Sequence, residues 1–239
     1  TATLGYDYYT NGNGASRGPT VDNRVKPDLV GPYSSIYTID MIGSNGYSNT
    51  NYTSGFGGTS GAGPVVVATS GILYQMYMEN FFDNNPEENI PLSSTIKALM
   101  FADAYQYPMN DNNLMYRNIQ GWGTPDIERS YNLGSEGHFF VDGGIDLEAG
   151  DSWSEEVYVD GGTSLKVSMV WIDPAASTYP EVCNDNDECF SRSLVNNLDL
   201  KLTSPSGMVY YGNNGLHDSI WSVSDMATND WSFLSLIHI

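Results

Sequence analysis

One short stretch in the first third of the chain combines residue types that suit nucleophilic catalysis. Residues 58–64 read Gly-Thr-Ser-Gly-Ala-Gly-Pro, and an apolar run from Val65 to Leu73 follows directly. Pro64 suits the first turn of a helix, where its missing N–H is no loss, so Ser60 is predicted to stand at a helix start. The N–H groups there lack partners and lie at the positive end of the helix dipole. Both features stabilise an oxyanion, which makes Ser60 a candidate nucleophile for acyl transfer.

An ordinary glycine-rich turn before a buried helix is the alternative interpretation of this stretch, because short motifs also match by chance. A serine nucleophile also needs a general base, and the base needs a carboxylate that orients it. No histidine precedes Ser60; the three in the chain are His138, His217 and His238. We interpret these three as surface or loop residues rather than as the base.

Further motifs lie on both sides of Ser60, in a fixed order. The motifs are Ser16-Arg17-Gly18-Pro19-Thr20, residues 25–32 (Val-Lys-Pro-Asp-Leu-Val-Gly-Pro), Gln120-Gly121-Trp122-Gly123, residues 170–174 (Val-Trp-Ile-Asp-Pro) and residues 194–200 (Leu-Val-Asn-Asn-Leu-Asp-Leu). Together with residues 58–64 they resemble the subtilisin-like serine proteases (subtilases), whose nucleophile lies in Gly-Thr-Ser-x-Ala-x-Pro. The last two motifs resemble the β-sandwich that follows the protease domain in the alkaline, oxidatively stable subgroup.

The resemblance covers most of the chain and implies an organisation into two parts. Residues 1–133 would be the C-terminal half of a three-layer α/β catalytic domain. Residues 136–233 would form an all-β, jelly-roll-like sandwich that is incomplete at its end. Residues 234–239 match the translation of a transposon-end DNA used in preparing sequencing libraries, so we interpret them as a possible sequencing scar. A genuine apolar edge strand is the alternative there.

The resemblance also implies a mechanism. Ser60 would form the acyl-enzyme, with Gly58, Thr59 and the backbone of Ser60 supporting the oxyanion. In subtilases the triad Asp and His precede the serine, as does an oxyanion Asn, and Asn11 and Asn13 lie too late in the chain to be that Asn. With no initiator Met at Thr1, we therefore expect a fragment with negligible peptidase activity alone. A protease homologue that has lost its catalytic residues, or a secreted binding module, are the alternatives.

Three positions depart from the usual subtilase pattern. Gly61 replaces a methionine beside the nucleophile, a site of oxidative inactivation, so this weakness is predicted to be absent. Gly31 replaces the usual alanine and Tyr33 the usual glycine in the upstream motif. Because of these two changes, the backbone near Gly31 and Tyr33 can differ from that of subtilases. They do not affect any residue with a predicted catalytic role.

The amino-acid composition limits the kinds of binding partner that we expect for this chain. The 239 residues hold 29 acidic and 9 basic side chains, for a formal net charge of −20. This balance argues against nucleic acid and anionic membranes as partners, and no segment is long and apolar enough to cross a membrane. The resemblance to subtilases implies an extracellular protein that acts on protein or peptide substrates, and we expect it to be a monomer.

Two cysteines and a group of carboxylates lie close together late in the chain. Cys183 and Cys189 frame five residues, and a disulfide-closed loop in an oxidising setting is expected, with a free thiol pair as the alternative. Oxygen-rich side chains in and after this loop suit calcium; a solvated acidic loop is the alternative. No organic cofactor is expected. The candidate calcium ligands are Asp185, Asp187, Glu188 and Asp199.

Periodicity predicts the elements that position these residues. Helices are expected from Ser60 to about Met78, as a buried helix, and from Ser93 to Ala104. Strands are expected over Trp153–Asp160 and Ser164–Ile172 and from Leu198 onward. Residues 204–207 (Ser-Pro-Ser-Gly) predict a turn into another strand over Met208–Tyr211.

Overall fold

The computed structural model describes most of the chain in separate stretches. These are residues 16, 18, 25–82, 90–105, 117–136, 145–160, 165–174, 195–212 and 235–238, the last stretch and Asn118 by their backbone alone. The elements, in chain order, are β1 (Ile36–Ile39), β2 (Tyr52–Phe56), α2 (Thr59–Met78), α3 (Ser93–Asp103), α4 (Arg117–Gln120), α5 (Ile127–Ser135), β3 (Lys166–Met169), β4 (Lys201–Thr203), β5 (Val209–Tyr211) and β6 (Ser235–His238).

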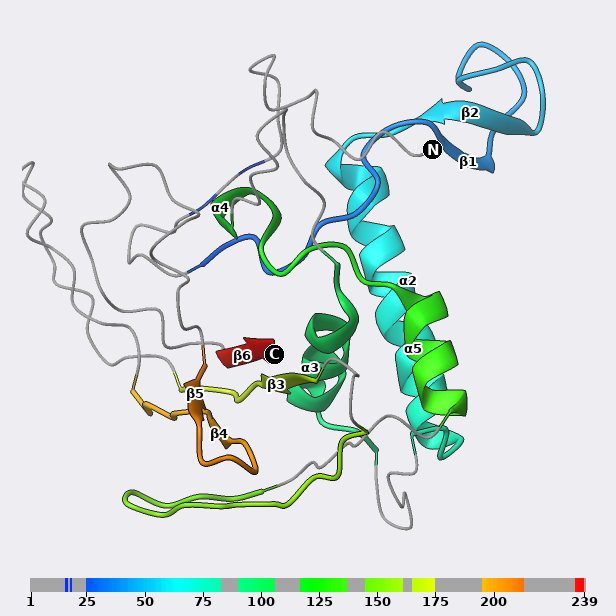
Figure 1. Ribbon diagram of the computed structural model, residues 1–239. Helices are drawn as coiled ribbons and strands as arrows, with labels where there is room; N and C mark the ends of the chain where they lie inside the picture. Colours follow the sequence, from blue (N-terminus) through cyan, green and yellow to red (C-terminus); the bar gives the residue numbers. More distant parts are fainter. Residues whose placement is uncertain are drawn as a thin grey trace, which may run out of the picture.

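Helix α2 begins at Thr59, which confirms the predicted helix at the serine. Its burial differs from the expectation, because the helix is buried on one side only. Leu73 is 1% exposed, whereas Val67 is 67% and Ile72 46% exposed. Among the described elements, α3 and α5 pack against α2 (Figure 1), and they leave its other faces uncovered.

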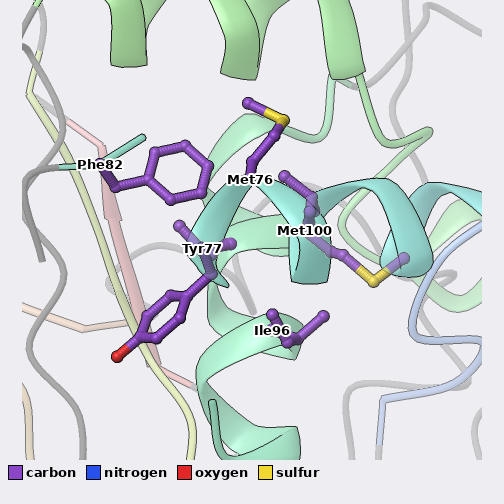
Figure 2. Close-up of a cluster of buried hydrophobic side chains, with 7 residues drawn as sticks. Met76, Tyr77, Phe82, Ile96 and Met100 are labelled. Atoms are coloured by element: carbon purple, nitrogen blue, oxygen red, sulfur yellow. The ribbon is translucent and has the colours of Figure 1, made fainter. Parts of the chain in front are cut away.

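The main apolar core forms between α2 and α3. Helix α3 agrees with the predicted helix to within one residue and buries the expected apolar positions. Figure 2 shows side chains from both helices converging, with Phe82 from the turn after α2 beside them. The buried members of this cluster are Leu73, Met76, Tyr77, Phe82, Ile96, Leu99 and Met100.

Helix α5 was not predicted, although the sequence carries a signal for it. The Asp126 side chain accepts a hydrogen bond from the N–H of Arg129 at 2.9 Å, which caps the helix. Gly134 lies against the core, because a Cβ there would stand 2.5 Å from Phe81. The Asp cap followed by Glu128 in the first turn is the pattern that could have revealed α5.

The strands form three two-stranded antiparallel sheets, β1–β2, β3–β6 and β4–β5. The β4–β5 hairpin confirms the predicted turn, with the Ser204 N–H donating to the Met208 carbonyl at 2.8 Å and Gly207 at φ 82°. The expected strand over Trp153–Asp160 is wrong, because residues 151–160 form no ladder with any described strand. The three-layer domain and the sandwich stay predictions.

The last residues also meet the rest of the chain. The backbone of β6 pairs with β3, with Val167 opposite Ile237. This pairing corresponds to the alternative of an edge strand, while the interpretation of residues 234–239 as a scar stays a prediction. None of the helices in the described stretches is both long and apolar enough to cross a membrane.

Candidate active site around Ser60

The turn before Ser60 is built by glycine and by close backbone contacts. The Gly58 N–H donates to the Tyr33 carbonyl at 2.7 Å, and the Gly58 carbonyl accepts from Gly61 at 3.0 Å and Ala62 at 3.1 Å. Gly58 has a φ of 84°, which disfavours other residues. A Cβ on Gly57 would lie 2.6 Å from the Tyr33 carbonyl oxygen. The segment at Tyr33 therefore fixes where α2 begins.

This turn places Ser60 in the first turn of α2 with its side chain exposed. No described residue accepts a hydrogen bond from the Ser60 N–H. An exposed Oγ and an unpaired N–H at the positive end of a 20-residue helix are the arrangement that acyl transfer needs on the nucleophile's side. Thr59 and Gly58 contribute backbone to the same turn, as the sequence predicts.

Two unusual glycines allow other segments to approach α2 closely. Gly61 is buried, and a Cβ there would stand 2.5 Å from Ile36 Cδ1 and 3.2 Å from Phe56 Cε1. A Cβ on Gly31 would stand 2.9 Å from the Ala62 carbonyl oxygen. Gly61 thus stands where the base of the β1–β2 hairpin packs, and a methionine there would need the hairpin to move.

Two motifs that lie far apart in the sequence pair with each other. The Trp122 N–H donates to the Asp28 carbonyl at 2.9 Å, and the Val30 N–H donates to the Gly123 carbonyl at 3.0 Å. Gly121 has a φ of 55° and lies against the backbone of Asp28. Residues 25–32 are therefore held to residues 120–123, and through Gly31 to α2. The pairing of these two motifs therefore helps to position the serine turn.

Partly buried charges and an aromatic contact hold this pairing. The Asp28 carboxylate accepts from Lys26 at 2.5 Å and from Lys97 at 3.2 Å. The Arg117 guanidinium lies 4.7 Å from the centre of the buried Trp122 ring and donates to the Gly121 carbonyl at 3.1 Å. Burial lowers the pKa of Arg117 to about 10, which still leaves it charged at neutral pH.

A second charged cluster, which the sequence analysis missed, joins α3 to α5 and β3. The Asp103 carboxylate accepts a hydrogen bond from the Ser130 hydroxyl, and Arg129 Nε lies 4.0 Å from its other oxygen. Burial raises the pKa of Asp103 to about 6, although these partners oppose the shift. Lys166 Nζ donates to the Ala104 carbonyl at 2.8 Å, and burial lowers its pKa to about 8. These contacts lie at the C-terminal end of α3, and none of them involves the first turn of α2.

The three histidines, the two early asparagines and the candidate calcium and disulfide residues fall mostly outside the described residues. His138 and His217 lie there, as do Asn11 and Asn13, and only the backbone of His238 is described. Asp199 is exposed, and the described residues hold no group of three metal-binding side chains. The metal and disulfide predictions therefore rest on residues beyond the described stretches, which are Cys183, Cys189, Asp185, Asp187 and Glu188.

The two motifs assigned to the β-rich part also meet. Asp173 accepts backbone hydrogen bonds from Val195 at 2.7 Å and Asn196 at 2.8 Å. Asn196 adds a side-chain hydrogen bond to the same carboxylate at 3.0 Å. In this structure Asp173 orders the chain ahead of β4.

The chain has distant relatives among proteins named as proteases. No protein-family model matches it. It is 27% identical over 257 residues to the serine protease/ABC transporter B family protein tagD of Dictyostelium discoideum, which covers 84% of this chain and 14% of that protein. For tagB of the same organism the identity is 26% over 268 residues, with 88% and 14% covered.

A bacterial relative matches a shorter part. C5a peptidase of Streptococcus pyogenes is 27% identical over 116 residues, which cover 48% of this chain and 9% of that protein. The chain thus spans a small part of the length of the curated relatives it matches. These similarities connect it distantly with proteins that are named as serine proteases or peptidases.

Proposed function

We propose that this chain forms the serine-bearing part of a secreted, subtilisin-like serine endopeptidase. The observation that carries the proposal is the exposed Ser60 in the first turn of α2, with an N–H that has no partner among the described residues. The relatives named as serine proteases support the same class. Secretion is supported by the expected disulfide between Cys183 and Cys189.

In the proposed mechanism, Ser60 Oγ attacks the carbonyl carbon of the scissile peptide bond. The proton of the hydroxyl passes to a histidine, which an aspartate orients, and both come from parts of the full protein outside this chain. The Ser60 N–H donates to the oxyanion that forms on the former carbonyl oxygen. The amine product leaves with the proton, and water then hydrolyses the acyl-serine ester.

The proposal predicts a sharp difference between the isolated chain and the complete protein. Loss of the base in a subtilisin triad costs about 10⁶ in kcat, so these 239 residues alone should show negligible turnover. This expectation would be contradicted if the isolated chain hydrolysed peptides and Ser60→Ala abolished that activity.

The test uses the full reading frame, obtained by extending the coding DNA upstream. The expressed protein is treated with a fluorophosphonate, which labels activated serines, and the adduct is located by mass spectrometry. We expect the label on Ser60 and its loss in Ser60→Ala. Ser93→Ala is the matched control, because Ser93 is an exposed serine in the first turn of α3. An unlabelled Ser60, or upstream sequence without Asp-x-Gly and His-Gly-Thr segments, would indicate a non-catalytic homologue.

A further inference from the structure

The hairpin that leads into the serine turn has an unusual composition. It runs from Ile36 to Phe56, and we call it the recognition hairpin. Asp40 is its only charged residue, in a chain with a formal net charge of −20, and most of the others are Tyr, Ser, Thr, Asn or Gly. Antibody loops use a similar composition, because tyrosine offers a large rigid surface while Ser, Gly and Asn offer adaptable hydrogen bonds.

Between its two ends, the recognition hairpin exposes its apolar side chains. The rings of Tyr37 and Tyr52 stack across the two strands, with centroids 5.6 Å apart and planes 9° apart. Ile39 pairs with Tyr52 in the ladder and is 79% exposed. Clustered exposed apolar side chains of this kind mark binding surfaces. The exposed apolar residues are Tyr37, Ile39, Met41, Ile42, Tyr47 and Tyr52.

The loop of the hairpin is held in one conformation by its own polar groups. The Asp40 carboxylate accepts from the N–H groups of Met41 at 2.9 Å, Tyr47 at 3.1 Å and Ser48 at 2.7 Å. The hydroxyls of Ser48 and Thr50 donate to the Tyr52 carbonyl at 2.8 Å and 2.6 Å. A surface ordered in advance loses less conformational entropy on binding.

The hairpin is also fixed beside the nucleophile. Its two ends, Ile36 and Phe56, pack over Gly61, the residue after Ser60. Figure 1 shows the two strands at the N-terminal end of α2, away from α3. Among the described strands β1 and β2 pair only with each other, so their outer edges can accept a further extended chain.

We propose that the recognition hairpin binds an extended, uncharged segment of the polypeptide substrate, with aromatic or aliphatic side chains, next to the bond that Ser60 attacks. The choice of this occupant rests on the proposed function and on the hairpin's place beside Ser60. The near absence of charge means that stacking and backbone hydrogen bonds, rather than ion pairs, hold the segment. Its affinity is therefore insensitive to salt.

Binding is tested in the full protein carrying Ser60→Ala, so that turnover does not interfere. The probe is a fluorescein-labelled peptide of about twelve alternating Phe and Thr residues, about 40 Å long when extended, followed by fluorescence anisotropy. A second probe has Glu in place of Phe. We expect the aromatic probe to bind, the acidic probe to bind far more weakly, and Tyr37→Ser/Tyr52→Ser to raise the Kd for the aromatic probe about tenfold.

Controls separate binding from folding. Tyr158→Ser is the matched control, because Tyr158 is 89% exposed and lies outside the hairpin; it should bind like the parent. Tyr37→Phe/Tyr52→Phe keeps the stacked rings and should also retain binding. If the double serine variant unfolds, Ile39→Glu replaces it, since that exposed position tolerates charge in the fold and should still lose the aromatic probe.

Other outcomes would contradict the hairpin proposal or the proposed function. No binding of the aromatic probe, or equal binding by the parent and the hairpin variants, overturns the proposal. The proposal is also overturned if the parent sediments as a dimer and Tyr37→Ser/Tyr52→Ser sediments as a monomer, because a second copy of the chain would then occupy the hairpin. An unlabelled Ser60 in the full protein together with probe binding contradicts the proposed function but leaves the hairpin as a peptide-binding surface.

Discussion

The glycine after the nucleophile should tolerate a methyl group far less well than another glycine of the same helix. An added Cβ at Gly61 meets Ile36 Cδ1 at 2.5 Å and Phe56 Cε1 at 3.2 Å. At Gly71, which is exposed in the middle of α2, an added Cβ meets nothing within 4 Å. Gly61→Ala and Gly71→Ala therefore compare the same chemical change in two environments.

The expected magnitude follows from two terms. Replacing Gly by Ala within a helix stabilises it by about 1 kcal/mol, and this term cancels between the two variants. Forcing an extra carbon into a packed contact costs about 1–3 kcal/mol, and only Gly61 has this term. Gly61→Ala should therefore be less stable than Gly71→Ala by about 1–3 kcal/mol in the free energy of unfolding.

Urea denaturation followed by circular dichroism measures this difference. Ile36→Val removes the Cδ1 atom that the new methyl group meets, so Gly61→Ala should cost less in an Ile36→Val background. Gly61→Met should be more damaging than Gly61→Ala. Equal stability of Gly61→Ala and Gly71→Ala, or no coupling to Ile36→Val, would refute the packing that we assign to the hairpin base.

Three other predictions test the charged cluster, the aromatic contact and the metal. Burial raises the pKa of Asp103 from 3.8 to about 6. The protonated carboxyl therefore contributes fully to the free energy of unfolding below about pH 4, and this contribution is lost as the pH rises through 6. The stability of Asp103→Asn relative to the parent should then rise by about 3 kcal/mol between pH 4 and 7; a pH-independent difference in urea denaturation would contradict it. Trp122→Ala should cost about 3–5 kcal/mol, because the ring is 3% exposed and packs on Phe101. The half-exposed Trp153 is its control, and a similar loss in Trp153→Ala would show that burial is not the cause. A chelator should lower the thermal midpoint if calcium binds, and an unchanged midpoint would count against calcium.

The sequence predicted those elements whose signals are local. The helix at Ser60, the helix from Ser93 and the turn at residues 204–207 each depend on periodicity or turn residues within a few positions, and all three are confirmed. The turn before Ser60 is only partly local, because Gly58 supplies its positive φ, whereas the Tyr33 carbonyl that holds the turn comes from a distant segment. The structure therefore agrees with the predicted placement of Ser60 at a helix start.

What the sequence missed depends on contacts between distant segments. No local pattern shows that residues 25–32 pair with residues 120–123, or that Asp103 meets Ser130 across two helices. The one-sided burial of α2 was missed for the same reason, since an apolar run such as Val65–Leu73 does not say how many neighbours will cover it. The strand expected over Trp153–Asp160 had suitable residue types, but it pairs with no strand among the described residues.

The contacts around Ser60 divide the chemistry into two independent parts. Gly31, Gly57 and Gly61 let neighbouring backbone and side chains approach the first turn of α2, and none of these contacts involves a histidine or a carboxylate. In the proposed mechanism, the chain would therefore present the serine and one oxyanion donor whether or not a base is in place. Exposure of the serine hydroxyl and its activation by a base are separate properties, so a homologue that has lost its base would keep the same turn. Covalent labelling of Ser60 in the full protein is decisive for this reason, because it reports the activation of the hydroxyl and not its position.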